Sequence, residues 1–177
     1  MTSTAAVLQG SPRASRRHTD GLTSQGNPDG GPSARTRCDD QAVTGYDIIG
    51  DIHGCADPLE SLLDAMGYRH IDGAFRHPSR QAVFVGDLVD RGPQQLRVLE
   101  TVKAMVDAGS AQITMGNHEF NAICYGIPRA DGDYLRRHSD KNARQHRAFL
   151  EQLTAEQQRY YLDWFRRIPL WLDLGGV

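Results

Sequence analysis

Three apolar segments of the chain each end at a glycine and lead directly into a polar loop. They cover residues 46–50, 82–86 and 113–116 and are rich in Ile and Val, which favour buried strands. Over 57–66 and 93–106, between these segments, apolar residues recur every three or four positions, as on one face of a helix. Successive strands lie about 30 residues apart, the length of a βαβ unit. The sequence therefore predicts an α/β fold with a parallel βαβαβ core and helices against the sheet.

The sequence after the third segment is typical of helices. A helix is expected over 139–153, and Thr154 with Gln157 forms a capping box for a second helix. A final strand is expected over 170–174. The second helix also carries an aromatic stripe, which is typical of a core-facing surface, with a cofactor-stacking face as the alternative. The stripe consists of Tyr160, Tyr161, Trp164 and Phe165.

The first 44 residues differ in composition from the rest of the chain. Residues 1–44 contain eight Gly or Pro and few large apolar residues. Such a segment cannot bury enough apolar surface to offset the entropy lost on ordering. We therefore predict a disordered tail over 1–44 and one domain over 45–177, which is long enough to enclose a core.

Charge and composition exclude several classes of protein. The 20 Lys and Arg residues against 22 Asp and Glu give a net charge of −2, whereas a nucleic-acid-binding protein would carry a basic excess. No apolar run approaches the roughly 18 residues of a membrane span. The three cysteines are too few and too scattered for a disulfide framework. We therefore expect no nucleic-acid or membrane partner, and a cytoplasmic location.

Three polar clusters follow the three predicted strands. They read Gly-Asp-Ile-His-Gly over 50–54, Gly-Asp-Leu-Val-Asp-Arg-Gly over 86–92 and Gly-Asn-His-Glu over 116–119. Because the carboxyl ends of parallel strands meet at one edge of a sheet, these clusters should converge. Their side chains suit manganese, iron or zinc better than an all-oxygen calcium site. Each cluster alone is an ordinary turn or helix start, but their joint occurrence after three strands predicts a metal site.

The three clusters, in this order and at these separations, resemble the motifs of the calcineurin-like metallophosphoesterases. The resemblance covers residues 46–125 and is strongest to the phosphoprotein-phosphatase branch, which includes protein Ser/Thr phosphatases and bacterial bis(5′-nucleosyl)-tetraphosphatases. Cys55, directly after the first motif, resembles the tetraphosphatases, whereas Glu119, at the end of the third motif, is common to the protein phosphatases. The two groups of the branch therefore both remain possible. The resemblance implies a hydrolase of phosphate monoesters or anhydrides. Its substrate would be a phosphorylated small molecule, a dinucleoside polyphosphate or a phosphoprotein.

The resemblance also implies a cofactor of two divalent metal ions. Manganese is expected first, with iron, zinc or nickel as alternatives. Asp51 and His53 would hold the first ion, Asp87 would bridge both ions, and Asn117 would bind the second. A hydroxide held between the two ions is the implied nucleophile.

Catalytic and substrate-binding roles follow from the same resemblance. His118 would protonate or stabilise the leaving oxygen, and Asp90 would orient His118 and favour its charged form. Arg91 could clamp two phosphate oxygens with its guanidinium group, and Asn117 would also contact the substrate. The alternative for Asp90 and Arg91 is a pair that only ties its loop together.

The sequence also departs from the family pattern. The branch supplies two further histidines to the second metal from later segments, but no histidine follows His146. His138 and His146 lie in charged, helical sequence and not after a strand, so we give them no ligand role. Their spacing is not that of metal ligands, and we assign both to the surface. The expected fold is therefore the N-terminal half of a double-sheet sandwich, from a fragment or a shortened protein. The alternative function is a catalytically impaired module that only binds metal or phosphate.

A basic stretch lies within the helical part of the sequence. It could attract a phosphorylated substrate, although a solvated helix face is the favoured interpretation because acidic residues are mixed into it. The stretch consists of Arg129, Arg136, Arg137, Lys141, Arg144 and Arg147.

Overall fold

One mixed sheet organises the protein. The computed structural model describes residues 8–10 and 43–175, and its four-stranded sheet has the order β1-β2-β5-β6. Strands β2 (Gly45–Ile49), β5 (Arg80–Phe84) and β6 (Ala111–Ile113) are parallel, with β5 between the other two. The predicted parallel core is therefore confirmed.

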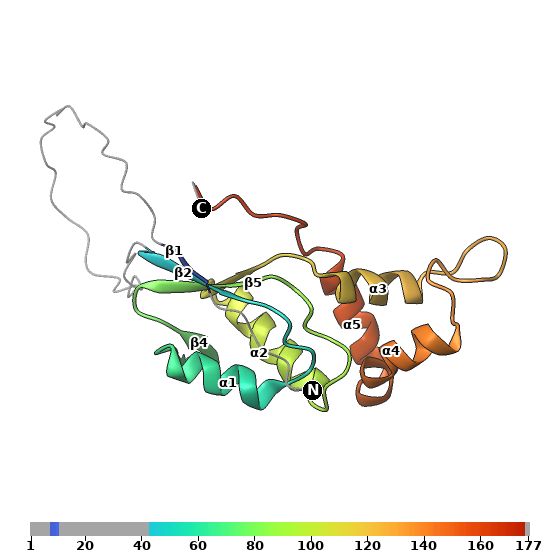
Figure 1. Ribbon diagram of the computed structural model, residues 1–177, viewed down its shortest axis with the longest axis horizontal. Helices are drawn as coiled ribbons and strands as arrows, with labels where there is room; N and C mark the ends of the chain where they lie inside the picture. Colours follow the sequence, from blue (N-terminus) through green and yellow to red (C-terminus); the bar gives the residue numbers. More distant parts are fainter. Residues whose placement is uncertain (1–7, 11–42, 176–177) are drawn as a thin grey trace, which may run out of the picture.

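The connections between these strands lie on one side of the sheet. Helices α1 (Ala56–Ala65) and α2 (Gln95–Asp107) run below the sheet in the view of Figure 1. Each buries the apolar face that the sequence spacing predicts. A separate antiparallel hairpin, β3 (Arg69–Ile71) and β4 (Ala74–Arg76), follows α1, and β4 contacts α2.

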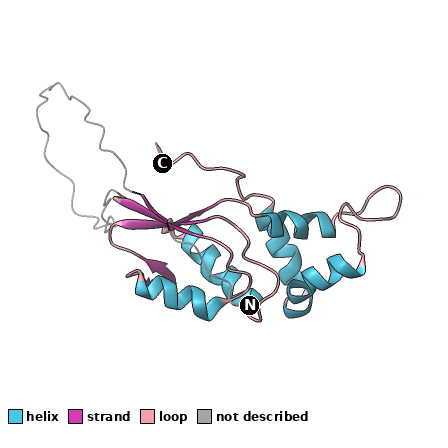
Figure 2. Cartoon of the chain, in the orientation of Figure 1, coloured by secondary structure: helices cyan, strands magenta, loops and turns pink. Residues whose placement is uncertain are grey.

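Three helices gather beyond the end of the sheet (Figure 2). They are α3 (Asn117–Gly126), α4 (Asp140–Gln152) and α5 (Ala155–Phe165). The Ser139 hydroxyl caps α4, and the capping box of Thr154 opens α5. Both helices therefore lie where their start signals predict them.

The aromatic stripe of α5 packs into the interior. Tyr161, Trp164 and Phe165 are buried, and Phe165 lies against Phe149 of α4. Tyr160 is the exposed member of the stripe. The core-facing interpretation of the stripe is thereby confirmed.

The expected strand over 170–174 is wrong. This segment is irregular, and Leu170 and Trp171 are 75% and 73% exposed. A strand needs the backbone hydrogen bonds of a neighbour. Just before the segment, the carbonyl of Pro169 accepts a hydrogen bond from the Met115 amide at 2.8 Å, but no ladder continues into 170–174.

The N-terminal tail is described only in part. Strand β1 (Leu8–Gly10) pairs antiparallel with β2, so the expected disorder does not hold for these three residues. The rest of that prediction falls on 1–7 and 11–42, outside the described residues. Residues 8–10 and 43–175 contain no second sheet stacked on the first. None of the helices in this described part has the length and apolar character that crossing a membrane requires.

Candidate active site

The three polar loops meet at the carboxyl ends of the parallel strands. The amides of His53 and Gly54 donate to the carbonyls of Asp87 and Leu88 at 2.9 and 2.7 Å, which joins the first loop to the second. A Cβ on Gly86 would lie only 2.0 Å from the Gly116 nitrogen, so the second and third loops touch through their backbones. The predicted convergence of the three motifs is therefore observed.

The buried carboxylate of Glu119 joins the second loop to the third. It accepts hydrogen bonds from the amides of Asp87 and Leu88, both at 2.8 Å, and from Gly116 at 3.1 Å. Burial raises the pKa of Glu119, while these hydrogen bonds act in the opposite direction. Glu119 thus holds the loops together, a structural role that the sequence does not reveal.

Unusual backbone conformations concentrate in these loops. Among the described residues, six other than glycine have positive φ, and five of them are candidate site residues. Such conformations persist where the surrounding structure enforces them, and they cluster at functional sites. The five are Asp51, His53, Asp87, Asp90 and Arg91.

The imidazole of His53 presents an unpaired nitrogen inside the site. Its Nδ1 lies 3.0 Å from the carbonyl of Val89, which fixes Nδ1 as the protonated nitrogen. Its Nε2 is buried, has no hydrogen-bond partner among the described residues, and lies 3.5 Å from Oδ1 of Asp51. A histidine held through one nitrogen, with the lone pair of the other available, is prepared to bind a metal.

Asp87 and Asn117 also fit a cation. The amide oxygen of Asn117 lies 3.2 Å from each carboxylate oxygen of Asp87. Two acceptors this close require either a cation between them or a reversed amide whose NH₂ group donates. Ligand atoms of His53, Asp87 and His118 all lie within 4.8 Å of one another. The donor set therefore fits a divalent metal ion.

Asp90 and His118 form a buried pair beside these ligands. Nδ1 of His118 donates to Oδ2 of Asp90 at 2.7 Å, and the two residues are 3% and 1% exposed. The hydrogen bond to Asp90 raises the pKa of His118 and outweighs burial, which acts to lower it. Burial would raise the pKa of Asp90, but its hydrogen bonds to His118 and His146 hold that pKa below the usual range.

His146 is a third buried member of the group formed by Asp90 and His118, so its assignment to the surface is wrong. It is 4% exposed, and its Nδ1 donates to Oδ1 of Asp90 at 2.7 Å. A signal for burial was present in the sequence. His146 shares the helical spacing of Phe149, Leu150 and Leu153, which are all buried or partly buried in the core. His138 is exposed, as expected.

Most of the remaining basic side chains lie at the surface, although Arg136 of the basic stretch is half-buried. Arg91 is exposed, and its charge acts to lower the pKa of His118. In the basic stretch, Arg129, Arg137 and Arg147 pair with Asp131, Asp133 and Glu151 at 2.8, 3.1 and 3.9 Å. These pairings agree with a solvated face.

Comparisons with known proteins agree with the motifs. Over 135 residues the chain is 32% identical to the bis(5′-nucleosyl)-tetraphosphatase PrpE (asymmetrical) of Oceanobacillus iheyensis, covering 74% of this chain and 52% of that protein. Over 85 residues it is 49% identical to the protein of the same name from Halalkalibacterium halodurans, covering 48% and 35%. The chain therefore spans about half or less of the length of these relatives.

A solved structure named as a candidate diadenosine tetraphosphatase covers 70% of this chain and 42% of its own, with 25% identity and a TM-score of 0.43. The model of the calcineurin-like phosphoesterase family matches residues 46–176, which is well over half of the chain. The motifs, the parallel core and this match agree, and the chain belongs to the calcineurin-like phosphoesterase family.

Proposed function

We propose that this chain carries the metal-binding half of a phosphoesterase that uses two divalent metal ions to hydrolyse phosphate esters or anhydrides. One observation carries the proposal: three loops bring the side chains of Asp51, His53, Asp87 and Asn117 together beside the His118–Asp90 pair. Family membership supports the same chemistry.

The proposed ligands divide between two ions. Asp51, His53 and Asp87 would hold the first ion, and Asp87 with Asn117 would contribute to the second, with manganese as the proposed metal. When bound, the ions would supply Lewis acidity and make a water molecule nucleophilic near neutral pH. The tautomer of His53 supports its part, because its protonated Nδ1 faces Val89 and leaves Nε2 for the metal.

His118 is the proposed proton donor. Its Nδ1 is committed to Asp90, so Nε2 is the nitrogen left to protonate the leaving oxygen. The raised pKa of His118 supports this role, because the ring keeps its proton closer to neutral pH. Arg91 is exposed at the same loop and is proposed to bind phosphate oxygens in a fork.

The proposed substrate is a dinucleoside polyphosphate. The support comes from the two PrpE relatives, which are named as bis(5′-nucleosyl)-tetraphosphatases. We also propose a cytoplasmic location, with which the free thiols of Cys55 and Cys124 agree.

Turnover assays with defined metals test the proposal. The chain would be stripped with a chelator, reloaded with Mn²⁺, and assayed on diadenosine tetraphosphate, a phosphopeptide and an aryl phosphate. We expect hydrolysis that requires metal and is fastest on diadenosine tetraphosphate. The matched control is His118→Asn, which should remain folded and metal-loaded but turn over slowly. Metal binding without turnover in the wild-type chain would instead support the binding module, and faster cleavage of the phosphopeptide would overturn the substrate.

A further inference from the structure

We infer that His146 is a positioning residue, which fixes the carboxylate of Asp90 so that Asp90 in turn fixes the proton donor His118. The inference rests on the proposed function for its catalytic consequence. Its structural basis is independent of that function, because it depends only on the contacts between α4 and the second polar loop.

The Asp90 carboxylate is shared evenly between two histidines. Oδ2 accepts from His118 and Oδ1 accepts from His146, both at 2.7 Å. All three side chains are almost completely buried, so water cannot replace either partner. A carboxylate that is bonded through both oxygens cannot rotate about its Cβ–Cγ bond without losing a hydrogen bond. His146 therefore restricts the direction in which Asp90 presents Oδ2 to His118.

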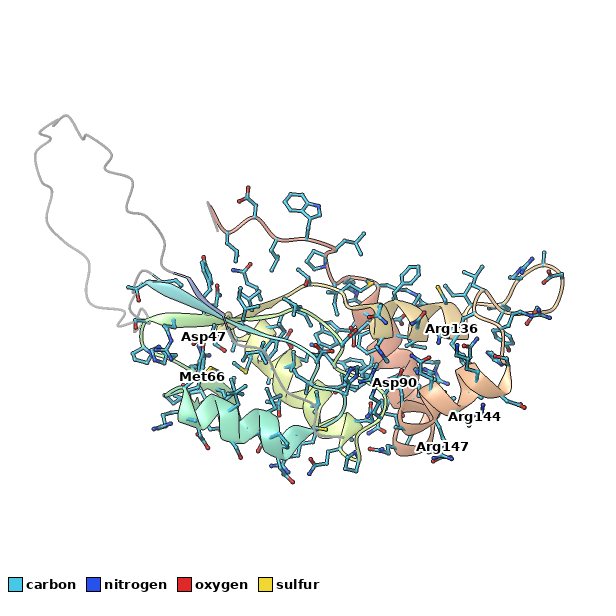
Figure 3. All side chains as sticks on the ribbon, viewed as in Figure 1. Asp47, Met66, Asp90, Arg136, Arg144 and Arg147 are labelled. Atoms are coloured by element: carbon cyan, nitrogen blue, oxygen red, sulfur yellow. The ribbon has the colours of Figure 1, made fainter. Side chains whose placement is uncertain are left out.

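The ring of His146 is itself fixed. It stacks on Phe149 with ring centroids 4.8 Å apart and an angle of 20°, and it lies 5.2 Å from the ring of Tyr125 in α3. Figure 3 places Asp90 beside the group of helices that contains α4. His146 does not belong to the group of described residues whose atoms could share a metal ion. Its contacts therefore indicate support of Asp90 and not metal binding.

A second contact from α4 supports the same loop. Gln152, near the end of α4, donates to the carbonyl of Gly92 at 3.0 Å and accepts from the amide of Gln95 at 3.0 Å. The side chain of Gln95 in turn bonds both backbone groups of Asp90. Asp90 has a φ of 71°, a conformation that must be enforced from outside. Helix α4 thus holds the backbone of this loop through Gln152, and it holds the side chain of Asp90 through His146.

Three variants of the full chain separate positioning from packing. His146→Leu removes the donor, whereas His146→Asn keeps an N–H near the position of Nδ1. Leu153→Val is the matched control, because it alters buried packing at the end of the same helix, seven positions from His146, and leaves the stack of His146 on Phe149 in place. If His146→Leu does not fold, His146→Gln replaces it. The Gln amide reaches toward the position of Nε2, so this variant also removes the donor at Nδ1 that faces Asp90.

Kinetics with Mn²⁺ provide the first measurement. For phenyl phosphate, whose leaving group needs a proton, we expect His146→Leu to lower kcat by about 10- to 100-fold. The loss should be smaller for nitrophenyl phosphate, and KM should change little for either substrate. His146→Asn should recover most of the rate, and Leu153→Val should keep the wild-type ratio between the two substrates. Equal losses on both substrates, or no recovery in His146→Asn, would overturn the inference.

The ring N–H protons provide a second measurement that needs no turnover. In the wild-type chain, NMR with ¹⁵N-labelled histidine should give hydrogen-bonded Nδ1–H signals for both His118 and His146. In His146→Leu the His118 signal should broaden or disappear through faster exchange, while Leu153→Val should retain it. An unchanged His118 signal in His146→Leu would contradict the inference. If the wild-type chain hydrolyses nothing, the proposed function fails, and this signal still decides whether His146 positions Asp90.

Discussion

At the scale of single residues, the site depends on side chains whose backbone is held in a costly conformation. A positive φ at a residue such as Asp87 or His53 costs about 1–3 kcal/mol. Hydrogen bonds to Glu119 and Val89 hold these two residues in place. The result is a set of acceptor atoms directed toward one another before any ligand binds, which reduces the reorganisation that metal binding requires.

Asp87→Asn tests the proposed bridging ligand. The substitution keeps the shape of the side chain but removes the charge that would be shared by both ions. We expect clearly weaker binding of both metal ions and loss of phosphoesterase activity, measured by metal analysis after dialysis and by hydrolysis of an aryl phosphate. Metal occupancy equal to that of the wild-type chain would rule out a bridging role for Asp87.

His118→Asn distinguishes a proton donor from a metal ligand. The atoms of His118 lie close enough to His53 and Asp87 to share an ion, so geometry alone permits either role. If His118 is a proton donor, His118→Asn should lower kcat by about 10²–10⁴-fold and leave metal occupancy largely unchanged. Metal content and kcat would be measured on the same sample. A loss of metal in parallel with activity would identify His118 as a ligand instead.

At the scale of elements, buried polar contacts connect parts of the fold that are distant in the chain. Asp47 on β2 accepts from Nε of Arg80 on β5 at 2.8 Å and from the hydroxyl of Tyr68 at 3.0 Å. Arg80 also donates to the carbonyl of Met66, just after α1. Burial, and then the charge of Asp47, raises the pKa of Tyr68, so its hydroxyl keeps its proton as a donor. This cluster fixes the end of α1 to the sheet.

Asp47→Ala should therefore destabilise the protein strongly. Removing one member of a fully buried ion pair costs about 3–5 kcal/mol. We expect a loss toward the lower end of that range, because Asp47 is fully buried but the Arg80 charge left behind is 29% exposed. Tyr68→Phe is the control that removes a single hydrogen bond, for which we expect about 1 kcal/mol. Urea unfolding followed by circular dichroism measures both. A loss for Asp47→Ala no larger than that for Tyr68→Phe would mean that the pair with Arg80 contributes little.

At the scale of the whole molecule, the ligands that we propose among the described residues would support two metal ions unequally. In the proposed site, Asp51, His53 and Asp87 would offer the first ion three ligands, whereas Asn117 and a shared Asp87 would offer the second only two. His138 and His146 do not fill this gap, since His146 bonds Asp90 and His138 bonds the carbonyl of Tyr125. The chain also covers 52% of the PrpE relative from Oceanobacillus iheyensis and 35% of that from Halalkalibacterium halodurans.

We therefore expect the 177-residue chain to bind one Mn²⁺ tightly and a second weakly, with slow turnover. A version extended with the C-terminal part of the Oceanobacillus iheyensis relative should bind two ions and react faster. Titration calorimetry and phosphatase rates on both proteins check this. Two tightly bound ions per monomer in the short chain, with equal rates, would show that its own residues or a second copy complete the site.

The sequence by itself determined the order of the elements and the polar motifs at the strand ends. Apolar runs such as 46–50 and the helical spacing over 93–106 are local signals, so they can be recognised without knowing what packs against them. The convergence of Asp51, Asp87 and Asn117 followed from these signals, because strands joined by βαβ connections are parallel and end at one edge. The capping box at Thr154 was likewise a local signal, and it set the start of α5.

Only the tertiary structure decided which side chains became partners. His146 lies 56 positions from Asp90, and a lone histidine on a charged helix has the same local sequence whether it is exposed or bonded to a buried carboxylate. Glu119 gained its role in the same way, from amides contributed by another loop. The segment 170–174 has the composition of a strand but no ladder of backbone hydrogen bonds. Whether such an interaction forms depends on residues distant in sequence, because a hydrogen bond needs a partner that only the fold can bring alongside.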